Sequence, residues 1–292
     1  MLIPLLSLST GADADADADA EVQGIFAQQQ QEQRRRRMRK LLFKGARNGN
    51  EQDVQKAIDF GVQVNRVSGD EDPPLILAAR NGSMGVLRQL LDAGAIIDAR
   101  SSTRLETALY SAIFHGHEEA ALLLLSAGAN PNLAAADRDF PITLASRMNR
   151  LHVVRALIQS RARVDSHDTD NNTALIYAAM RGSLPIAQAL IEAGASDAAG
   201  EDDRIALMFA VMELSKEHLD VVKALLRAGA PVNTRDDAGE SALMLAATVG
   251  NVKAVKRLLK AGADRTFLNK EGKSAADLAR ESGHEAVLAL LT

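Results

Sequence analysis

The stretch Asn172–Asp197 reads NTALIYAAMRGSLPIAQALIEAGASD and contains the plan of most of the chain. Two short apolar runs are separated by the polar break Gly182–Ser183, and the second run is closed by Gly194. The second run places apolar residues at the i, i+3 and i+4 spacing of an amphipathic helix. A glycine after such a run suits the left-handed conformation that ends many helices. The stretch therefore predicts two short helices joined by a tight turn.

The same unit recurs through most of the 292-residue chain. Its closing glycine returns at intervals of 33 to 35 residues, at Gly61, Gly94, Gly128, Gly194, Gly229 and Gly262, with Arg161 in the remaining slot. The units, numbered one to eight, span residues 40–65, 73–98, 107–132, 140–165, 172–197, 205–233, 241–264 and 274–292. Helices this short are marginal alone, so each unit must be stabilised by packing on its neighbours. We therefore expect an all-α repeat of about seven helix-turn-helix units plus a C-terminal cap.

Unit four departs from this plan at two positions. Asn149 stands where most other units have a mid-unit glycine, and Arg161 replaces the closing glycine. If Arg161 shares the left-handed backbone of its counterparts, its Cβ costs on the order of 1 kcal/mol. The substitution Arg161→Gly should then stabilise the protein by less than this, because glycine loses more entropy on folding.

The composition favours closely stacked helices and excludes several kinds of chemistry. Apolar residues make up 47% of the chain but aromatic residues only 3%, and there is no Trp. There is no Cys, which excludes disulfides, thiolate catalysis and Cys-based metal sites. The formal net charge of −4 does not favour nucleic acid as a partner of the whole chain. A Cys-free chain fits the cytosol, which we favour, and also fits a periplasmic or secreted protein.

Residues 1–38 differ from the repeat array that follows at 39–292. Aspartates alternate with alanines between Asp13 and Asp19, as in a solvated acidic tail, and a basic run follows at Arg34–Arg37. We expect a disordered or low-complexity tail that ends in a basic helix, formed with Glu21–Ala27, which leads into unit one. A solvated helix face is the simplest reading of the basic run, because no aromatic residues are interleaved for contact with nucleic acid.

The first residues offer an alternative reading as an export segment. Leu2–Leu8 is apolar, and Ala12–Ala14 has the A-x-A form of a cleavage site. The run is short and no Lys or Arg precedes it, so we favour the plain tail. No apolar run approaches ~18 residues, and we therefore expect no membrane span.

The units resemble the ankyrin repeat at three sets of positions. The opening matches at Thr107-Ala108-Leu109, Thr173-Ala174-Leu175 and Ser241-Ala242-Leu243, the mid-unit glycine at Gly82, Gly116, Gly182 and Gly250, and the closing leucines at Leu90-Leu91, Leu190 and Leu258-Leu259. The resemblance covers residues 40–292. It implies a curved solenoid of antiparallel helix pairs with short hairpin fingers between units. It also implies that a partner protein binds on the concave face.

The resemblance further implies that the two positions before the mid-unit glycine face the concave groove. These positions hold Arg80/Asn81, Phe114/His115, Arg147/Met148, Met180/Arg181, Met212/Glu213 and Thr248/Val249. We predict that the partner contacts Arg80, Phe114, His115, Met148, Met180, Arg181, Met212 and Val249, with Phe114, Met148, Met180, Met212 and Val249 forming an apolar line. Acidic fingertips would rim the groove, at Asp70, Glu71, Asp72, Asp137, Asp139, Glu201, Asp202 and Asp203. The alternative is that some of the apolar residues pack under the fingers.

Motifs for catalysis or for a cofactor are missing from the sequence. There is no phosphate loop, dinucleotide fingerprint or nucleophile elbow. His115 and His117, two positions apart, would diverge and make a poor metal pair. We therefore expect a monomeric, non-enzymatic protein–protein interaction module with no cofactor and no metal. The alternative is an inhibitor or protective regulator of an enzyme, either inside the cell or exported with its target.

Overall fold

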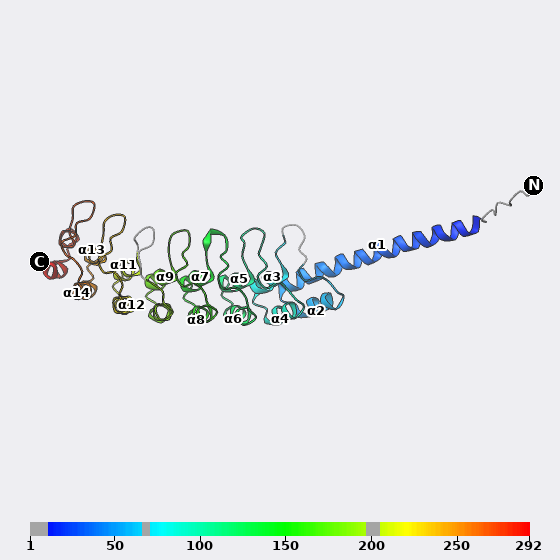
Figure 1. Cartoon of the computed structure of the whole chain (residues 1–292), viewed down its shortest axis with the longest axis horizontal. Coiled ribbons are helices and arrows are strands. Elements are labelled where there is room, and N and C mark those ends of the chain that lie inside the picture. The colour runs from blue at the N-terminus through cyan, green and yellow to red at the C-terminus, as the bar shows by residue number, and fades with distance from the viewer. Residues whose placement is uncertain (1–10, 66–70, 197–204) are drawn as a thin grey trace, which may run out of the picture.

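The computed structural model describes residues 11–65, 71–196 and 205–292, with side chains described from residue 23 onward. Each repeat unit folds into two antiparallel helices joined by a tight turn (Figure 1). The first helices are α1 (Gly11–Asn48), α3 (Pro74–Asn81), α5 (Ala108–Phe114), α7 (Pro141–Arg147), α9 (Ala174–Met180), α11 (Ala206–Val211), α13 (Ala242–Thr248) and α15 (Ala275–Glu281). The second helices are α2 (Glu51–Asp59), α4 (Met84–Asp92), α6 (Glu118–Ser126), α8 (Leu151–Gln159), α10 (Leu184–Glu192), α12 (Lys216–Arg227), α14 (Val252–Lys260) and α16 (Glu285–Leu291).

The helix pairs stack side by side in two rows (Figure 1). Each first helix packs against the first helices of its neighbours, and the second helices pack likewise. The loops between units project from the row of first helices (Figure 1). One loop contains a short 3-10 turn, η1 (Ala136–Arg138), and two carry an isolated antiparallel bridge, at His167–Thr173 and Arg235–Ser241. The predicted helical solenoid of seven units and a C-terminal cap is confirmed.

The core runs along the whole array and is built from Leu, Val, Ile and Ala. In unit five, Leu175, Ala178 and Ala179 of the first helix and Ile186 and Leu190 of the second are all buried. Burying one Leu or Ile side chain contributes about 1.5–3 kcal/mol. Because Ala has no side chain beyond Cβ, the paired alanines let neighbouring first helices approach closely.

The Thr or Ser that opens a unit caps its first helix. The side chains of Thr107, Thr173, Ser241 and Ser274 each accept a hydrogen bond from the backbone N–H three residues later. Such a cap satisfies one of the amide groups that a helix start leaves without a partner. The residues that carried the sequence resemblance are therefore the residues that fix where each helix begins.

The turns of unit four keep the geometry of the other units. Asn149 has φ +57° and Arg161 has φ +64°, while their unit-five counterparts Gly182 and Gly194 have φ +65° and +89°. The prediction that Arg161 shares the left-handed backbone is confirmed. The stacked helices therefore impose the turn conformation even where the residue is not glycine.

Side chains also form hydrogen bonds to the backbone of a neighbouring unit. His117, His218 and His284 each place Nε2 at 3.0–3.1 Å from a carbonyl oxygen at the end of the preceding unit's first helix, that of Arg80, Met180 and Thr248 respectively. At the closing turn of unit four, Asn132 of unit three donates from Nδ2 to the Arg161 carbonyl at 3.2 Å. The same side chain accepts a hydrogen bond from the Arg163 amide at 2.8 Å. These contacts fix the spacing between successive units.

Helix α1 differs from the other first helices in length. It begins at Gly11, ten residues before the expected start at Glu21. Only its C-terminal part packs on α2 and α3, while the rest extends beyond the array (Figure 1).

The boundary expected between residues 38 and 39 falls inside α1 and stays a prediction. The export pattern lies mainly in residues 1–10, outside the described residues. None of the helices described has both the length and the apolar character needed to cross a membrane.

Candidate protein-binding groove

The two positions before the mid-unit turn form two different surfaces. The earlier position, which we call the first slot, holds Phe114, Met180 and Met212, whose side chains are 42%, 37% and 45% exposed. Phe114 and Met180 are the last residues of α5 and α9, and Met212 directly follows α11. These three apolar side chains therefore face solvent in phase with the repeat.

At the later position, the second slot, apolar side chains are more buried than polar ones. Met148 and Val249 are half-buried here, and Met148 packs against the core, whereas His115 and Arg181 are exposed. A step of one residue turns a side chain by about 100° around a helix, so the two slots point in different directions. The sequence prediction placed residues of both slots on one apolar line. Its most exposed members lie in the first slot, and the residues that contact a partner stay a prediction.

Two arginines in the first slot are engaged in ion pairs. Arg80 contacts Asp72 at 2.5 Å and Glu106 at 3.0 Å. Burial by itself would lower the pKa of Arg80, but the hydrogen bonds and charges of these two carboxylates outweigh it and raise the pKa. Arg147 pairs with Asp139, and its guanidinium group lies 5.5 Å from the centre of the Tyr177 ring. Arg80, predicted to contact a partner, is therefore part of a network that joins units two and three.

The acidic fingertips are corrected in part by the same contacts. Asp139 is buried and Asp72 is partly buried, and each is held by an arginine at the base of a finger instead of standing at its tip. Glu71 and Asp137 are exposed as expected. The remaining predicted fingertip residues, at positions 70, 201, 202 and 203, lie outside the described residues.

Two tyrosines extend the polar network through units three to five. Tyr110 donates its hydroxyl hydrogen to Asp139 Oδ2 at 2.8 Å, and Tyr177 donates to Asp168 Oδ2 at 2.5 Å. Burial, followed by the hydrogen bond to the carboxylate, raises the pKa of both hydroxyls. Both therefore remain hydrogen-bond donors well above neutral pH. Sequence reasoning missed this network, and its only signal was a tyrosine in each of two mainly apolar runs.

A cavity of about 230 Å³ opens between the fingers of units three to five. Tyr110 and Phe114 form an aromatic wall, with ring centres 6.2 Å apart and planes at 15°. Its lining also includes the arginines Arg104 and Arg147 and the carboxylates Glu106, Asp137, Asp139, Asp168 and Asp170. Glu106, Asp139 and Asp168 are buried, while Asp137 and Asp170 are exposed. The cavity thus combines an apolar wall with a rim of accessible negative charge.

The histidines near this cavity are occupied by structural contacts. His115 Nδ1 lies 2.9 Å from the Ser111 carbonyl oxygen, and the His115 ring meets Phe114 edge-on at 5.3 Å. The His117 ring nitrogen Nε2 contacts the Arg80 carbonyl oxygen. Within the described residues, no group of three or more His, Asp or Glu side chains is arranged to hold a metal ion.

The chain matches one known protein family and is similar in sequence to several known proteins. The family described as "Ankyrin repeats (3 copies)" matches residues 42–135, 127–202 and 207–292. The Caenorhabditis elegans protein "Ankyrin repeat and KH domain-containing protein mask-1" is 28% identical over 73% of this chain and 8% of its own length. The Danio rerio protein "Putative palmitoyltransferase ZDHHC13" is 26% identical over 71% of this chain and 32% of its own length.

A solved structure supports the same conclusion about the fold. The ankyrin repeat domain of Bcl-3, described as a unique member of the IkappaB protein family, superposes with a TM-score of 0.65 and 28% sequence identity. The match covers 76% of this chain and 99% of that domain. The chain spans at most about a third of the length of the first curated relatives it matches. The similarity therefore concerns only part of each of these relatives.

Proposed function

Because the chain belongs to the ankyrin repeat family, we propose that it is a protein-binding module that holds a partner on the finger-bearing, concave side of its first helices. The observation that carries the proposal is the exposure of Phe114, Met180 and Met212 in one repeated slot. Single exposed apolar residues are ordinary, but large apolar side chains that recur in phase on one face are typical of binding surfaces. The core slots of the same helices are already filled by Leu and Ala, so packing does not require these three side chains.

The cavity beside Phe114 suggests how a partner is oriented. An aromatic wall with Asp137 and Asp170 at the rim suits a partner side chain that has an apolar body and a positive end. Buried apolar anchors supply most of the affinity of an interface, while rim charges mainly steer association. We therefore assign affinity to the three apolar residues and orientation to the two aspartates.

The proposal includes that the module acts as a monomer and has no catalytic activity of its own. The curated relatives are longer proteins, and one is named as a palmitoyltransferase, so activities of the whole relatives are not transferred to this chain. Under the regulator alternative, the partner is an enzyme whose activity changes when this chain binds it. If the captured partner is an enzyme, its activity measured with and without the purified chain separates an inhibitor from an adaptor.

The proposal is tested by changing Phe114, Met180 and Met212 together to Ser. Surface substitutions usually change stability by no more than about 0.5 kcal/mol each, so the variant should remain folded. It should lose most of the partner recovered by affinity purification from the source cell. The matched control is Leu122→Ser on the second helix α6, since Leu122 is as exposed as Met180. If the folded triple variant captures the same partner as the unchanged protein, the groove assignment is wrong.

A further inference from the structure

The loops that precede units four and five touch each other through one side-chain hydrogen bond. We call residues 133–139 finger four and residues 166–171 finger five. Arg138 of finger four donates from Nη2 to Nε2 of His167 in finger five, at 3.1 Å. The other ring nitrogen of His167, Nδ1, lies 3.2 Å from the Asp168 carbonyl oxygen. The contact therefore joins two fingers that both line the cavity of units three to five.

The chemistry of the two side chains requires a neutral histidine. A guanidinium group has N–H donors and no acceptor, so Arg138 needs a lone pair on Nε2 of His167. Nδ1 then carries the ring hydrogen and donates it to the Asp168 carbonyl. Protonation would place a second N–H on Nε2, pointing at the N–H of Arg138, and would bring two positive charges together. The contact therefore exists only while the ring is neutral.

Finger five gives His167 a fixed support. The Asp168 side chain accepts hydrogen bonds from two backbone amides of its own loop, at 2.9 and 3.0 Å, and from the Tyr177 hydroxyl at 2.5 Å. An isolated antiparallel bridge between His167 and Thr173 closes the base of the finger. Loss of the arginine contact should therefore leave finger five in place.

Finger four is strained next to the contact. Asp137 has φ +62° and Arg138 has φ +54°, in the left-handed region that residues with a Cβ adopt only at a cost. The residues on either side are fixed, because Ala136 donates its amide hydrogen to the Arg104 carbonyl at 2.7 Å and Asp139 is buried. Loss of the histidine contact should therefore free Asp137 and Arg138 alone.

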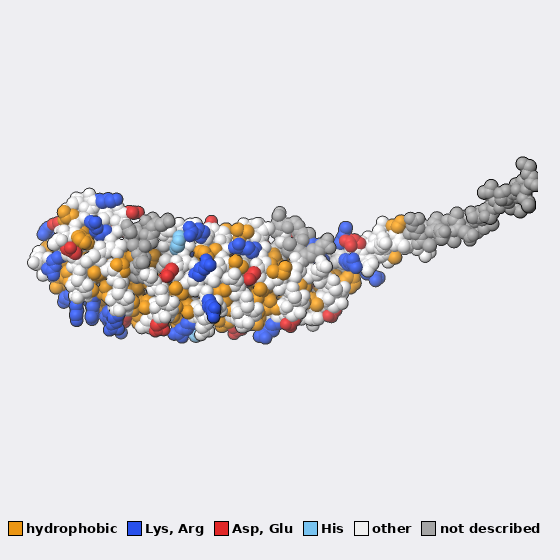
Figure 2. Space-filling model, viewed as in Figure 1, with side chains coloured by type: hydrophobic (Ala, Val, Ile, Leu, Met, Phe, Trp, Pro, Cys, Tyr) orange, Lys and Arg blue, Asp and Glu red, His pale blue; other side chains and the backbone are white. Residues whose placement is uncertain are grey.

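Other charged groups leave the histidine ring free to respond to pH. The carboxylates of the two fingers are Asp137, Asp139, Asp168 and Asp170. On the adjoining helices, Arg147 of α7 pairs with Asp139, and Tyr177 of α9 donates to Asp168. None of these groups forms an ion pair with the His167 ring. Charges of both signs are interspersed over the finger-bearing side of the array (Figure 2), so no field of one sign opposes the change.

We propose that Arg138 and His167 form a pH-sensitive clasp: acidification protonates His167, releases Arg138 and frees Asp137 to leave the rim of the cavity. An ordinary histidine is half protonated near pH 6.5, so the released form should gain about tenfold over the clasped form between pH 7.5 and 5.5. The clasp is present at the higher pH and lost at the lower. Its consequence for partner binding rests on the proposed function, which assigns Asp137 to orienting the partner, whereas the clasp itself is tested on the purified chain alone.

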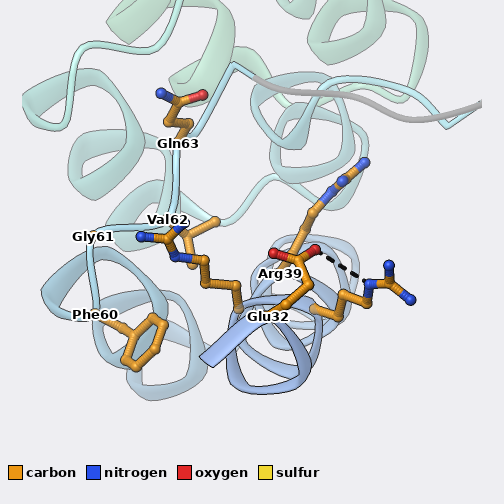
Figure 3. A pocket seen from close by; sticks show the side chains of 8 residues that line it. Glu32, Arg39, Phe60, Gly61, Val62 and Gln63 are labelled. Atoms are coloured by element: carbon orange, nitrogen blue, oxygen red, sulfur yellow. Dashed lines mark hydrogen bonds and ion pairs between the residues drawn. The ribbon is translucent and has the colours of Figure 1, made fainter. Parts of the chain in front are cut away.

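An ordinary exposed ion pair behaves differently in this pH range. Glu32 and Arg36 on α1 lie 3.2 Å apart (Figure 3). The attraction between a carboxylate and an arginine persists down to about pH 4, where carboxylates are protonated. The backbone around this pair should therefore be silent between pH 7.5 and 5.5, which makes it an internal reference.

Amide NMR signals of the purified chain between pH 7.5 and 5.5 test the clasp. The signals of Asp137 and Arg138 should move with pH, while that of Arg36 stays constant. In His167→Gln the glutamine oxygen can accept from Arg138 at both pH values, so the two signals should keep their positions. The matched control His152→Gln removes an exposed histidine of α8 and should leave the response unchanged. Arg138→Ala should show the acid position of the Asp137 signal already at pH 7.5.

Two results would overturn the clasp. One is a constant Asp137 signal in the unchanged chain, and the other is a response that persists in His167→Gln. Affinity purification tests the consequence separately: partner recovery at pH 5.5 should fall at least about threefold for the unchanged chain and for His152→Gln, but not for His167→Gln. Recovery that ignores pH while the Asp137 signal responds would overturn the role of Asp137 in orienting the partner.

Discussion

Units four and five are consecutive copies of one plan, yet they reach the same backbone with different residues. Unit five has glycine at both left-handed turns, Gly182 and Gly194, whereas unit four has Asn149 and Arg161. The two slots differ in what surrounds them. A Cβ on Gly194 would meet no atom within 4 Å, but a Cβ on Gly182 would lie 2.8 Å from the His218 ring of unit six. The closing slot therefore requires only a left-handed backbone. The mid-unit slot of unit five also requires a residue without a Cβ, because the His218 ring lies too close.

The same distinction explains why unit four tolerates Asn149. His117 and His284 directly follow the mid-unit glycine of their own units and contact the preceding unit. In unit five that position holds the smaller Ser183. A Cβ in the mid-unit slot of unit four therefore faces no histidine ring from the next unit. Glycine is required where a neighbour supplies a histidine.

The largest effect should come from Gly182→Ala, which adds a Cβ to the crowded slot. The alanine must adopt φ near +65°, at a cost of about 1–2 kcal/mol, and must displace His218 from the Met180 carbonyl, at a cost of about 1 kcal/mol. We expect a total loss of about 2–3 kcal/mol in the free energy of unfolding, measured by denaturant titration.

The control for this comparison is Gly194→Ala, which adds a Cβ to the open slot. Only the backbone cost applies there, so the loss should be about 1–2 kcal/mol, smaller than that of Gly182→Ala by about 1 kcal/mol. Adding His218→Ala to Gly182→Ala should cost less than the sum of the two single losses, because the clash is then relieved. Equal losses for the two glycine variants would show that the mid-unit slot is not crowded.

A smaller effect should come from the side chains that bridge the closing turns. Asn132 makes two hydrogen bonds to unit four, whereas Asp165 accepts one from the Ser196 amide of unit five at 3.0 Å. Asn132→Asp should lower the free energy of unfolding by about 1 kcal/mol, because a carboxylate cannot donate to the Arg161 carbonyl. Asp165→Asn should raise it by about 0.5 kcal/mol by supplying a donor. Matching denaturation midpoints for the two variants would refute the bridge.

The smallest effect should come from Arg161→Gly, which gives unit four the closing residue of unit five. The left-handed strain of Arg161 is removed, while the Asn132 hydrogen bond to its carbonyl remains. We expect a gain below about 1 kcal/mol, since the glycine loses more backbone entropy on folding. A thermal or denaturant midpoint at or below that of the unchanged protein would show that Arg161 makes a stabilising contact of its own.

The period of the sequence was sufficient to predict the fold, because capping, turns and helix stripes are encoded within each unit. Thr173 caps the helix that follows it, and Gly194 adopts the left-handed conformation of the closing turn. Both roles can be inferred from a single unit. The candidate groove was predicted less well. Spacing locates the slots before the turn but does not show that a side chain one residue further, such as Met148, rotates back toward the core.

The polar network was beyond prediction from the sequence. Tyr110 meets Asp139, which lies 29 residues later at the end of the loop before the next unit, and that pairing depends on how far the two units are offset. No local pattern encodes such an offset.

Site-specific photo-crosslinking in the source cell tests the binding surface most directly. A photoreactive phenylalanine analogue is placed at position 114, on the finger-bearing side, and in a second variant at position 122, on the second helix α6. We predict that the variant at position 114 becomes covalently joined to one dominant partner protein on illumination and that the variant at position 122 does not. Crosslinking of the partner from position 122 but not from position 114 would place the partner on the second helices and contradict the account.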